Sequence, residues 1–381
     1  MLPALEVRWL SESDVFLGPW YASLDEPQKA QESVLKTLLA GYRKTSYGAR
    51  YSASEVSSIE DFRKNFPVAD YEFFVPYLDA IAEGRHEALL PEPARGWVMT
   101  RGTTGPPKLF PITNTHLRQI FICGSRALLN YARRRNRFEI FSKPVLNLSF
   151  PSEVGQMKTG DGNTVSYGYS SGTYARLNPG IGSFRLVPSQ EEIDALGRGG
   201  KRNDWIRRFE LVFEKAKDLE VGTLIGVAPL MVSFARYLRR SHGLYPKKVW
   251  NINALFCTSV PKIQVKYAPY LKRLYGDADV VEIYSATEGV YAQQLNELPY
   301  VSPNYDSYLF EVWTKRGFKM LYELKRGEWG RMVISSCILP RYDIGDLVES
   351  FGNNFFRIIG RAKANTILEH MLYRALTCWF D

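Results

Sequence analysis

Cysteine and histidine are scarce in this sequence, and neither residue type forms a group. The four cysteines and four histidines are scattered along the chain: Cys123, Cys257, Cys337, Cys378, His86, His116, His242 and His370. No pair has the spacing of a zinc site, and no disulfide framework is visible. The pattern favours a reducing, cytosolic setting. We expect His116, at the start of a predicted helix, to be structural.

Long apolar runs, internal repeats and low-complexity segments are also lacking. No stretch reaches the ~18 uninterrupted apolar residues of a membrane span. Residues 1–20 lack the basic segment and apolar block of a signal peptide. With 45% hydrophobic and 23% charged residues, the composition is that of a globular protein. We therefore expect a cytoplasmic protein with no membrane partner.

Acidic residues are the minority charge. Lys and Arg number 49 against 40 Asp and Glu, a formal net charge of +9. An anionic substrate, a nucleic acid or a membrane surface would each suit this excess. The densest basic run, residues 133–137, follows an apolar stretch and is typical of a solvated helix end. No nucleic-acid-binding module accompanies it, so no nucleic-acid partner is expected.

The order of predicted elements favours an α/β fold: layered, parallel-rich sheets flanked by helices, with a small antiparallel β-barrel-like subdomain. Beyond residue 205, helix and strand patterns alternate, with strands at 221–226, 254–258 and 279–285 and helices between them, one at 265–275. From residue 307 only short strands follow, one of them at 319–324, separated by turns. Four regions are predicted: a helical lead-in at 1–90, an α/β core at 91–304, the antiparallel subdomain at 305–360, and a hinge with a terminal helix at 361–381.

The strongest motif is Thr-Arg-Gly-Thr-Thr-Gly-Pro-Pro-Lys at residues 100–108, between predicted strands at 96–99 and 108–112. Glycine lets the backbone turn tightly and approach an anion. Backbone N–H groups, threonine hydroxyls and a lysine in one loop suit a polyphosphate. The run lacks the Walker form, so from this loop alone an ordinary hairpin turn stays an alternative.

Two further motifs lie at predicted strand ends. Tyr-Ser-Ala-Thr-Glu-Gly at 284–289 follows a parallel strand, and open α/β sheets bind ligands at such carboxyl ends. The ring of Tyr284 suits a base, the hydroxyl of Thr287 a phosphate oxygen, and the carboxylate of Glu288 a divalent cation. In the run 339–346, Asp346 suits the hydroxyls of a ribose. Taken singly, Tyr284 is equally typical of a core aromatic, while Glu288 and Asp346 are more typical of a solvated carboxylate and a plain turn.

In this order and spacing, the three motifs resemble those of the adenylate-forming superfamily, which includes acyl-CoA synthetases, luciferases and peptide-synthetase adenylation domains. The detail is closer to the auxin-responsive acyl acid amido synthetases and their bacterial relatives, through residues 61–90, 308–312 and 327–348. The resemblance covers most of residues 28–361.

The resemblance implies a ligase that activates a small carboxylic acid with ATP and Mg²⁺. It forms acyl-AMP, releases pyrophosphate, and passes the acyl group to an amine or thiol acceptor, free or on a carrier protein. The implied catalytic residues are Thr104, Lys108, Thr287 and Glu288, with Glu288 also the Mg²⁺ ligand. The implied ATP-binding residues are Thr100, Gly102, Thr103, Gly105, Thr258, Ser259, Tyr284, Ser285, Ala286, Asp346 and Arg361. The acyl pocket is expected from residues 167–174 and the helix that includes Leu117.

Two features depart from the resemblance. Arg101 stands where a small residue is usual, which adds charge at the phosphates or narrows access. After Arg361 the chain has 20 residues, where relatives continue into a lid domain. Lys363 is the only lysine beyond this hinge. Residues 367–376 predict an apolar helix face, which we expect to dock on the core; the start of a truncated lid and a partner-binding face are the alternatives.

Three alternatives therefore stay open. The first is a lid supplied by another chain. The second is an acyl-protein synthetase-like protein without a lid, which carries the acyl group on Cys257 or Cys337. The third is a non-catalytic nucleotide- or acyl-binding partner of a larger ligase.

Overall fold

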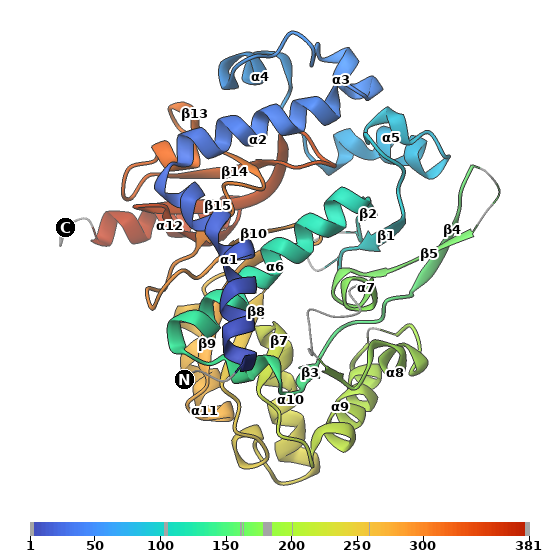
Figure 1. Ribbon diagram of the computed structural model, residues 1–381, viewed down its shortest axis with the longest axis vertical. Coiled ribbons are helices and arrows are strands. Elements are labelled where there is room, and N and C mark those ends of the chain that lie inside the picture. The colour runs from blue at the N-terminus through green and yellow to red at the C-terminus, as the bar shows by residue number, and fades with distance from the viewer. Residues whose placement is uncertain are drawn as a thin grey trace.

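The computed structural model describes residues 4–102, 106–160, 162, 164–177, 185–199, 201–258 and 260–377, with side chains described from residue 13 to residue 372. The fold is mixed α/β, with three sheets and helices packed around them (Figure 1). Among the described residues, no helix is long and apolar enough to cross a membrane.

The largest sheet has seven strands in the order β11-β10-β9-β8-β7-β3-β6. Strands β6, β3, β7, β8 and β9 run parallel, while β10 and β11 are antiparallel at one edge. The bounds are β3 Val145–Asn147, β6 Leu186–Val187, β7 Thr223–Val227, β8 Ala254–Thr258, β9 Asp279–Ala286, β10 Gly289–Gln293 and β11 Ser302–Pro303.

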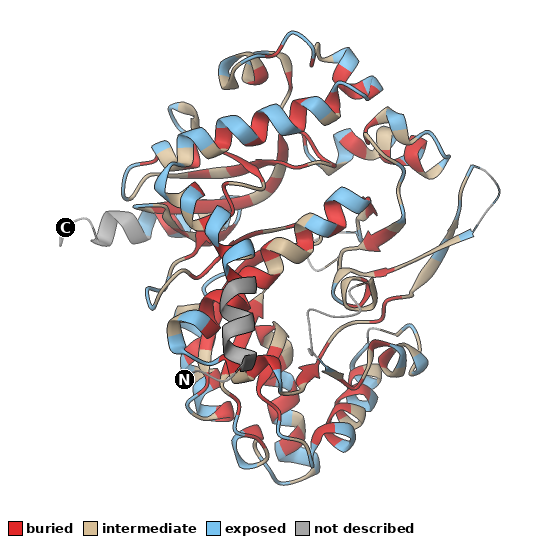
Figure 2. Ribbon diagram, viewed as in Figure 1, coloured by how far each residue is buried: buried red, intermediate tan, exposed pale blue. Residues whose placement is uncertain are grey.

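Helices cover both faces of this sheet. The side chains of β8 alternate: Ala254 and Phe256 pack with α1 (Ala4–Asp25) and α6 (Asn114–Arg135), whereas Leu255 and Cys257 pack with the helices of the other face. Those helices are α9 Arg202–Ala216, α10 Ala228–Ser241 and α11 Ala268–Tyr275. Burial on both faces explains why β7 and β8 are apolar over most of their length (Figure 2).

The other two sheets are smaller. The first has the order β2-β1-β5-β4, with β1 parallel to β5, and the second is antiparallel with the order β13-β12-β14-β15-β16. Their bounds are β1 Gly96–Met99, β2 Leu109–Ile112, β4 Gly155–Lys158, β5 Thr164–Tyr169, β12 Leu309–Thr314, β13 Gly317–Met320, β14 Trp329–Ser335, β15 Tyr342–Gly352 and β16 Phe355–Arg361. The antiparallel sheet is open, with β13 and β16 as its edges, so the expected barrel-like closure is not formed by the described strands.

Several helices begin at a side-chain cap. Ser58 and Ser189 form capping boxes, and Asp70 and Thr113 accept bonds from the first turn of the helix that follows each. The remaining helices complete the fold. The bounds are α2 Pro27–Tyr42, α3 Ser46–Arg50, α4 Ile59–Asn65, α5 Tyr71–Ala82, α7 Ser170–Leu177, α8 Gln190–Ala195 and α12 Ala364–Thr377.

The N-terminal helices pack on the antiparallel sheet. Gln31 of α2 donates to the carbonyls of Tyr305 and Tyr308, both at 2.7 Å, and accepts from Phe310 N. Residues from the predicted lead-in and from the predicted β subdomain share one hydrophobic cluster. The division of the chain into four regions stays a prediction.

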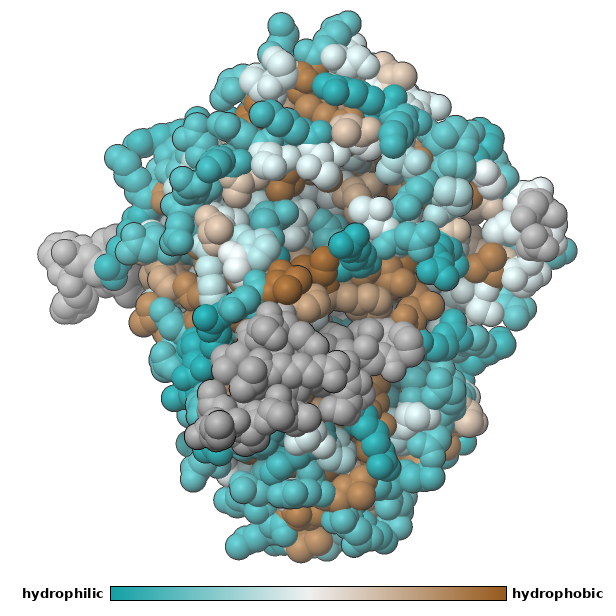
Figure 3. Space-filling view, viewed as in Figure 1, coloured by the Kyte–Doolittle hydropathy of each residue, from teal (hydrophilic) through white to brown (hydrophobic). Residues whose placement is uncertain are grey.

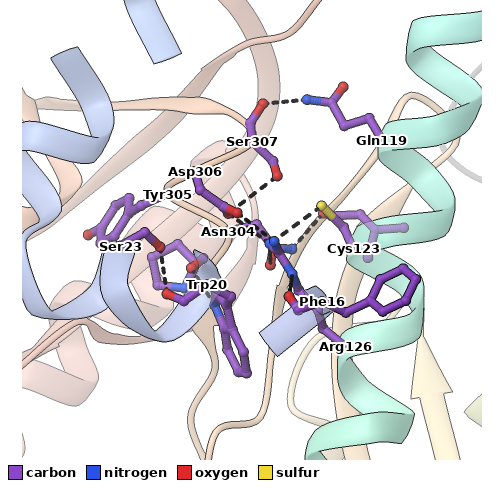
Figure 4. A network of polar contacts seen from close by, with 12 residues as sticks. Phe16, Trp20, Ser23, Gln119, Cys123, Arg126, Asn304, Tyr305, Asp306 and Ser307 are labelled. Atoms are coloured by element: carbon purple, nitrogen blue, oxygen red, sulfur yellow. Dashed lines mark hydrogen bonds and ion pairs between the residues drawn. The ribbon is translucent and has the colours of Figure 1, made fainter. Parts of the chain in front are cut away.

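A buried arginine ties the two halves of the molecule together (Figure 4). Arg126 of α6 donates to Asn304 Oδ1 and Asp306 Oδ1, both at 2.8 Å, and to the carbonyl of Phe16 in α1 at 3.1 Å. Its guanidinium thus bonds groups of two other segments, α1 and the turn before β12, which fixes α6 against both.

The terminal helix differs from the expectation. The described part of α12 contacts β16 and buries His370 edge-on against Trp329, with ring centroids 5.0 Å apart. Leu368, Met371 and Leu372 are exposed instead. The predicted docking through an apolar face is therefore wrong for these three residues, because the contact is made by a histidine on the opposite side of the helix.

Two element boundaries also shift. The predicted strand at 319–324 is β13 followed by a 3₁₀ turn at Leu321–Glu323, and the predicted helix at 265–275 begins as a π-helical turn, Ile263–Tyr267. Apolar periodicity locates such segments but does not distinguish these conformations.

Candidate active site

A cavity of about 690 Å³ lies where the β1–β2 hairpin, the carboxyl ends of β8 and β9, and the strands β15 and β16 meet. All eleven described residues of the predicted site line it: Thr100, Gly102, Lys108, Thr258, Tyr284, Ser285, Ala286, Thr287, Glu288, Asp346 and Arg361. Thr103, Thr104, Gly105 and Ser259 lie outside the described residues. Three stretches distant in sequence thus converge on one hollow.

Thr287 and Glu288 form the tip of a hairpin. They connect β9 to β10, which pair antiparallel from Ala286 and Gly289 onward. Two side chains hold the main chain of this tip: Oη of the half-buried Tyr174 donates to the Thr287 carbonyl at 2.8 Å, and Nε2 of the buried His116 lies 3.2 Å from the Glu288 carbonyl. Burial lowers the pKa of His116 to about 4, so its neutral ring donates through Nε2. His116 is structural, as expected, and its partner is the candidate catalytic turn.

The Glu288 carboxyl is buried in the cavity wall. Burial raises its pKa to about 7, against the lowering effects of Arg361 and Lys108. No cation of the described residues lies within ion-pair distance of it. A buried carboxyl without a fixed partner is suited to receive a proton or a metal ion.

Asp346 is held from two sides. Tyr284 Oη donates to Asp346 Oδ2 at 2.9 Å, and Arg361 Nε lies 3.3 Å from Asp346 Oδ1. Burial raises the pKa of the Asp346 carboxyl, while Arg361 and the Tyr284 hydroxyl lower it. Gly345, at a φ of 77°, gives the backbone the left-handed turn that precedes Asp346. The carboxylate is therefore fixed in the wall of the cavity.

The loop at 100–108 is closed at its base. Thr100 N donates to the Lys108 carbonyl and Lys108 N to Thr100 Oγ1, both at 2.9 Å. Lys108 Nζ lies 4.9 Å from the centroid of the Tyr71 ring, and Leu109 N donates to the Tyr71 hydroxyl. Stacking on an aromatic face holds an ammonium in place without neutralising it.

Arg101 lies in the cavity wall on the side of Phe150, with its guanidinium carbon 5.5 Å from the centroid of that ring. Burial lowers the pKa of Arg101, and none of the described carboxylates is within ion-pair distance. A desolvated cation without a counter-ion favours an anionic ligand.

One part of the cavity is apolar. Helix α6 contributes Ile120, Phe121 and Leu128, and strands β3 and β7 with their flanks contribute further aliphatic side chains. Tyr169 and Tyr174, from the segment expected to form the acyl pocket, line the same cavity.

Two cavity residues were missed in the sequence. Glu282 lines the cavity two residues before Tyr284 on β9, and burial raises its pKa to about 7. Period-2 alternation puts both side chains on one face of the strand, so this signal was present. Tyr71 could not be found from sequence, because it reaches the loop at 100–108 through packing of α5 on β2.

Two thiols considered as acyl carriers are poorly placed. Cys257 is fully buried and Cys337 half-buried, and neither lines the cavity. Burial raises the pKa of Cys337 to about 12 and that of Cys257 further. Both thiols therefore stay protonated at neutral pH, which suppresses nucleophilic attack.

The comparison with known protein families gives a match in the N-terminal half of the chain. Residues 20–191 match the GH3 family N-terminal domain. A stretch of 94 residues is 34% identical to indole-3-acetic acid-amido synthetase GH3.15 of Arabidopsis thaliana. It covers 24% of this chain and 16% of that protein. The predicted resemblance to the acyl acid amido synthetase branch is confirmed, with the GH3 domain as its basis.

Solved structures extend the likeness beyond the GH3 domain. The fold is similar to the GH3.15 acyl acid amido synthetase in complex with 2,4-DB, with a TM-score of 0.74 at 17% identity over 92% of this chain and 71% of that one. A 2-hydroxyisobutyryl-CoA ligase in complex with 2-HIB-AMP gives a TM-score of 0.62 at 17% identity, over 88% and 68% of the two chains. The α/β fold class predicted from the sequence is confirmed.

The two buried glutamates of the cavity make stability depend on pH. Glu282 and Glu288 have folded pKa values of about 7 against an ordinary 4.5, so the folded state holds protons that the unfolded state releases. The free energy of unfolding is therefore expected to fall between about pH 4.5 and 7, by roughly 3 kcal/mol per group.

Thermal melting without nucleotide or metal, from pH 5 to 8, checks this dependence. In Glu282→Gln the loss of stability with rising pH is expected to be about half as steep. An equally steep fall in the variant would contradict the assignment to Glu282.

Proposed function

We propose that this protein activates a carboxylic acid with ATP, forming acyl-AMP and pyrophosphate, and then passes the acyl group to an amine or thiol acceptor. The observation that carries the proposal is the convergence of the three motifs on one cavity. The GH3 domain and the fold likeness to two acid-activating enzymes support it.

The polar end of the cavity suits the nucleotide. We assign the phosphates to Thr100, Gly102 and Lys108, which line the cavity, and the ribose hydroxyls to Asp346 with Arg361. We assign the base to Tyr284, with Thr258, Ser285 and Ala286 beside it. The Thr287 hydroxyl is proposed for the α-phosphate, where charge builds as the carboxylate attacks. Thr103, Thr104, Gly105 and Ser259 belong to the same proposal through their positions in the motifs.

A magnesium ion fits this arrangement through Glu288. Mg²⁺ is commonly held by one or two carboxylates together with substrate phosphates and water. Within the described ranges no three His, Cys, Asp or Glu side chains gather as a preformed metal centre. Glu288 would therefore share the ion with the nucleotide, and the ion would offset charge on the phosphates.

The apolar end suits the body of the acid. Its walls are aliphatic and aromatic, and Arg101 supplies a positive charge at its border. Enclosure of the reacting carboxylate next to the α-phosphate contributes to rate through positioning. We further propose that another chain supplies the lid and that the acceptor is carried by a protein. The proposed location is the cytoplasm. Cys123, Cys257 and Cys337 form no disulfide, in line with a reducing compartment.

Acid-dependent exchange of labelled pyrophosphate into ATP tests the proposal, with MgCl₂ and a panel of aromatic and aliphatic acids. Exchange above the acid-free rate is expected for at least one acid, together with ATP binding in titration calorimetry. ATP binding without exchange for any acid would favour the non-catalytic alternative, and absence of both would contradict the proposal.

His116 is expected to act by positioning the Glu288 turn. His116→Phe removes the donor to the Glu288 carbonyl and leaves that buried oxygen unpaired. We expect the exchange rate to fall ~10-fold at saturating ATP and acid, with a smaller change in the KM for the acid. His116→Gln retains an N–H donor and should recover part of the rate. Equal losses in both variants would assign His116 to packing alone.

A further inference from the structure

The whole net charge of the protein lies in one stretch, residues 221–276. This stretch contains no Asp or Glu and nine Lys or Arg residues, so the other 40 basic residues balance all 40 acidic ones. The nine side chains are all exposed, and we call them the basic face: Arg236, Arg239, Arg240, Lys247, Lys248, Lys262, Lys266, Lys272 and Arg273.

The basic face is continuous across α10 and α11. Arg236 Nε and Nη2 lie 3.3 and 3.2 Å from the hydroxyl of Tyr270, which places the outer side of α10 next to that of α11. Lys266 and Arg273 precede and follow Tyr270 by one helical turn, and Arg240 follows Arg236 by one turn. At the end of α11, a Cβ on Gly276 would lie 3.5 Å from Lys247 Cβ.

None of these nine cations is neutralised within the part of the chain that the structure describes. Ion pairs occur elsewhere but not at the basic face. The densest basic run of the sequence behaves differently, because Arg133, Arg134 and Arg135 pair with Asp14, Glu297 and Asp279. The densest run of positive charge in the sequence therefore does not mark the surface whose cations lack ion pairs.

Two guanidinium groups of the basic face are held against aromatic rings. Arg236 stacks on Tyr270 at 5.5 Å and Arg239 on Tyr245 at 5.4 Å. Ordering a guanidinium reduces the entropy lost when it pairs with a carboxylate. Leu244 and Val265, 40% and 73% exposed, add apolar contacts among these charges. In Figure 3 the end of the molecule where α10 lies is largely hydrophilic with small hydrophobic spots.

One end of this surface adjoins the cavity. Thr258, Val260 and Pro261 line the cavity, and Lys262 is the next residue, leading into the π-helical turn. We propose that the basic face docks an acidic protein beside the cavity mouth. A cationic surface with isolated apolar side chains is typical of a protein interface. Binding to a membrane surface would require a larger apolar face. Binding to a nucleic acid would rest on phosphate contacts and would leave Leu244 and Val265 without a role.

Binding measurements with charge-reversed variants test the docking surface. The basic-face variant carries Arg236→Glu, Arg240→Glu, Lys266→Glu and Arg273→Glu. A control variant with the same net charge carries Lys36→Glu, Lys64→Glu, Lys325→Glu and Arg326→Glu, all exposed and outside the basic face. The probe is a small acidic helical carrier protein, and fluorescence anisotropy is read at 50 and 300 mM NaCl. A DNA duplex and phosphatidylserine vesicles are the comparison probes.

Wild type and control are expected to bind the carrier protein with similar affinity, weakened by salt. The basic-face variant should bind at least tenfold more weakly, with an unchanged melting temperature. Equal binding by all three proteins, no binding by wild type, or tighter binding of DNA or vesicles than of the acidic protein would each overturn the proposal. Because no arm measures exchange, this outcome is independent of the proposed reaction.

Discussion

Replacing Glu288 with glutamine is expected to lower acid-dependent pyrophosphate exchange by roughly two to three orders of magnitude, as for other groups that stabilise transition-state charge. The amide keeps the shape of the side chain but cannot offer a negative oxygen to Mg²⁺. The carboxyl lies in the cavity wall with a pKa of about 7, so wild type itself should gain Mg²⁺ affinity from pH 6 to 8 as the proton leaves.

Exchange at several MgCl₂ concentrations and pH values measures both effects. The variant should lose the pH dependence of Mg²⁺ affinity as well as the rate. Glu369→Gln, an exposed carboxyl on α12, is the matched control. A Glu288→Gln protein within threefold of wild type at all Mg²⁺ concentrations would exclude Glu288 as the metal ligand.

Arg341→Met is expected to destabilise the fold by about 3 kcal/mol, because the buried Glu311 loses its bidentate partner and keeps only the contact of Arg63 Nε with Glu311 Oε1 at 2.9 Å. Arg341 Nε and Nη2 lie 2.9 and 3.1 Å from the two carboxylate oxygens of Glu311, and the side chains are 3% and 1% exposed. Arg341 Nη1 also donates to the carbonyls of Arg63 and Phe66. The arginine of the third motif therefore anchors α4 to the antiparallel sheet.

Urea denaturation gives the free energy of unfolding for this comparison. The double variant Arg341→Met with Glu311→Met removes both charges and should recover a large part of the loss. Lys29→Met, which breaks an ion pair with both side chains more than half exposed, should cost far less than Arg341→Met. A loss of similar size in Lys29→Met would contradict the dependence on burial.

Local patterns predicted the elements that carry the motifs. Strands at 96–99 and 254–258 form with the predicted bounds, and the helix expected to start near His116 begins at Asn114, capped by Thr113. These predictions succeed because the apolar pattern of a strand and the cap of a helix are formed by residues that are neighbours in the sequence. The π-helical turn, the open antiparallel sheet and the exposed face of α12 depend on distant packing, and the sequence patterns did not distinguish them.

The order and chemistry of the three motifs, the excess of positive charge and the lack of metal-binding spacing were determined by the sequence alone. The tertiary structure decided that Tyr284 and Arg361 hold Asp346 and that His116 and Tyr174 hold the Glu288 turn. It also decided that Arg133, Arg134 and Arg135 are paired with carboxylates, whereas the cations of the basic face have no ion-pair partner among the described residues. Each of these contacts joins residues far apart in the chain, and which distant side chains meet is set by how helices and sheets pack together.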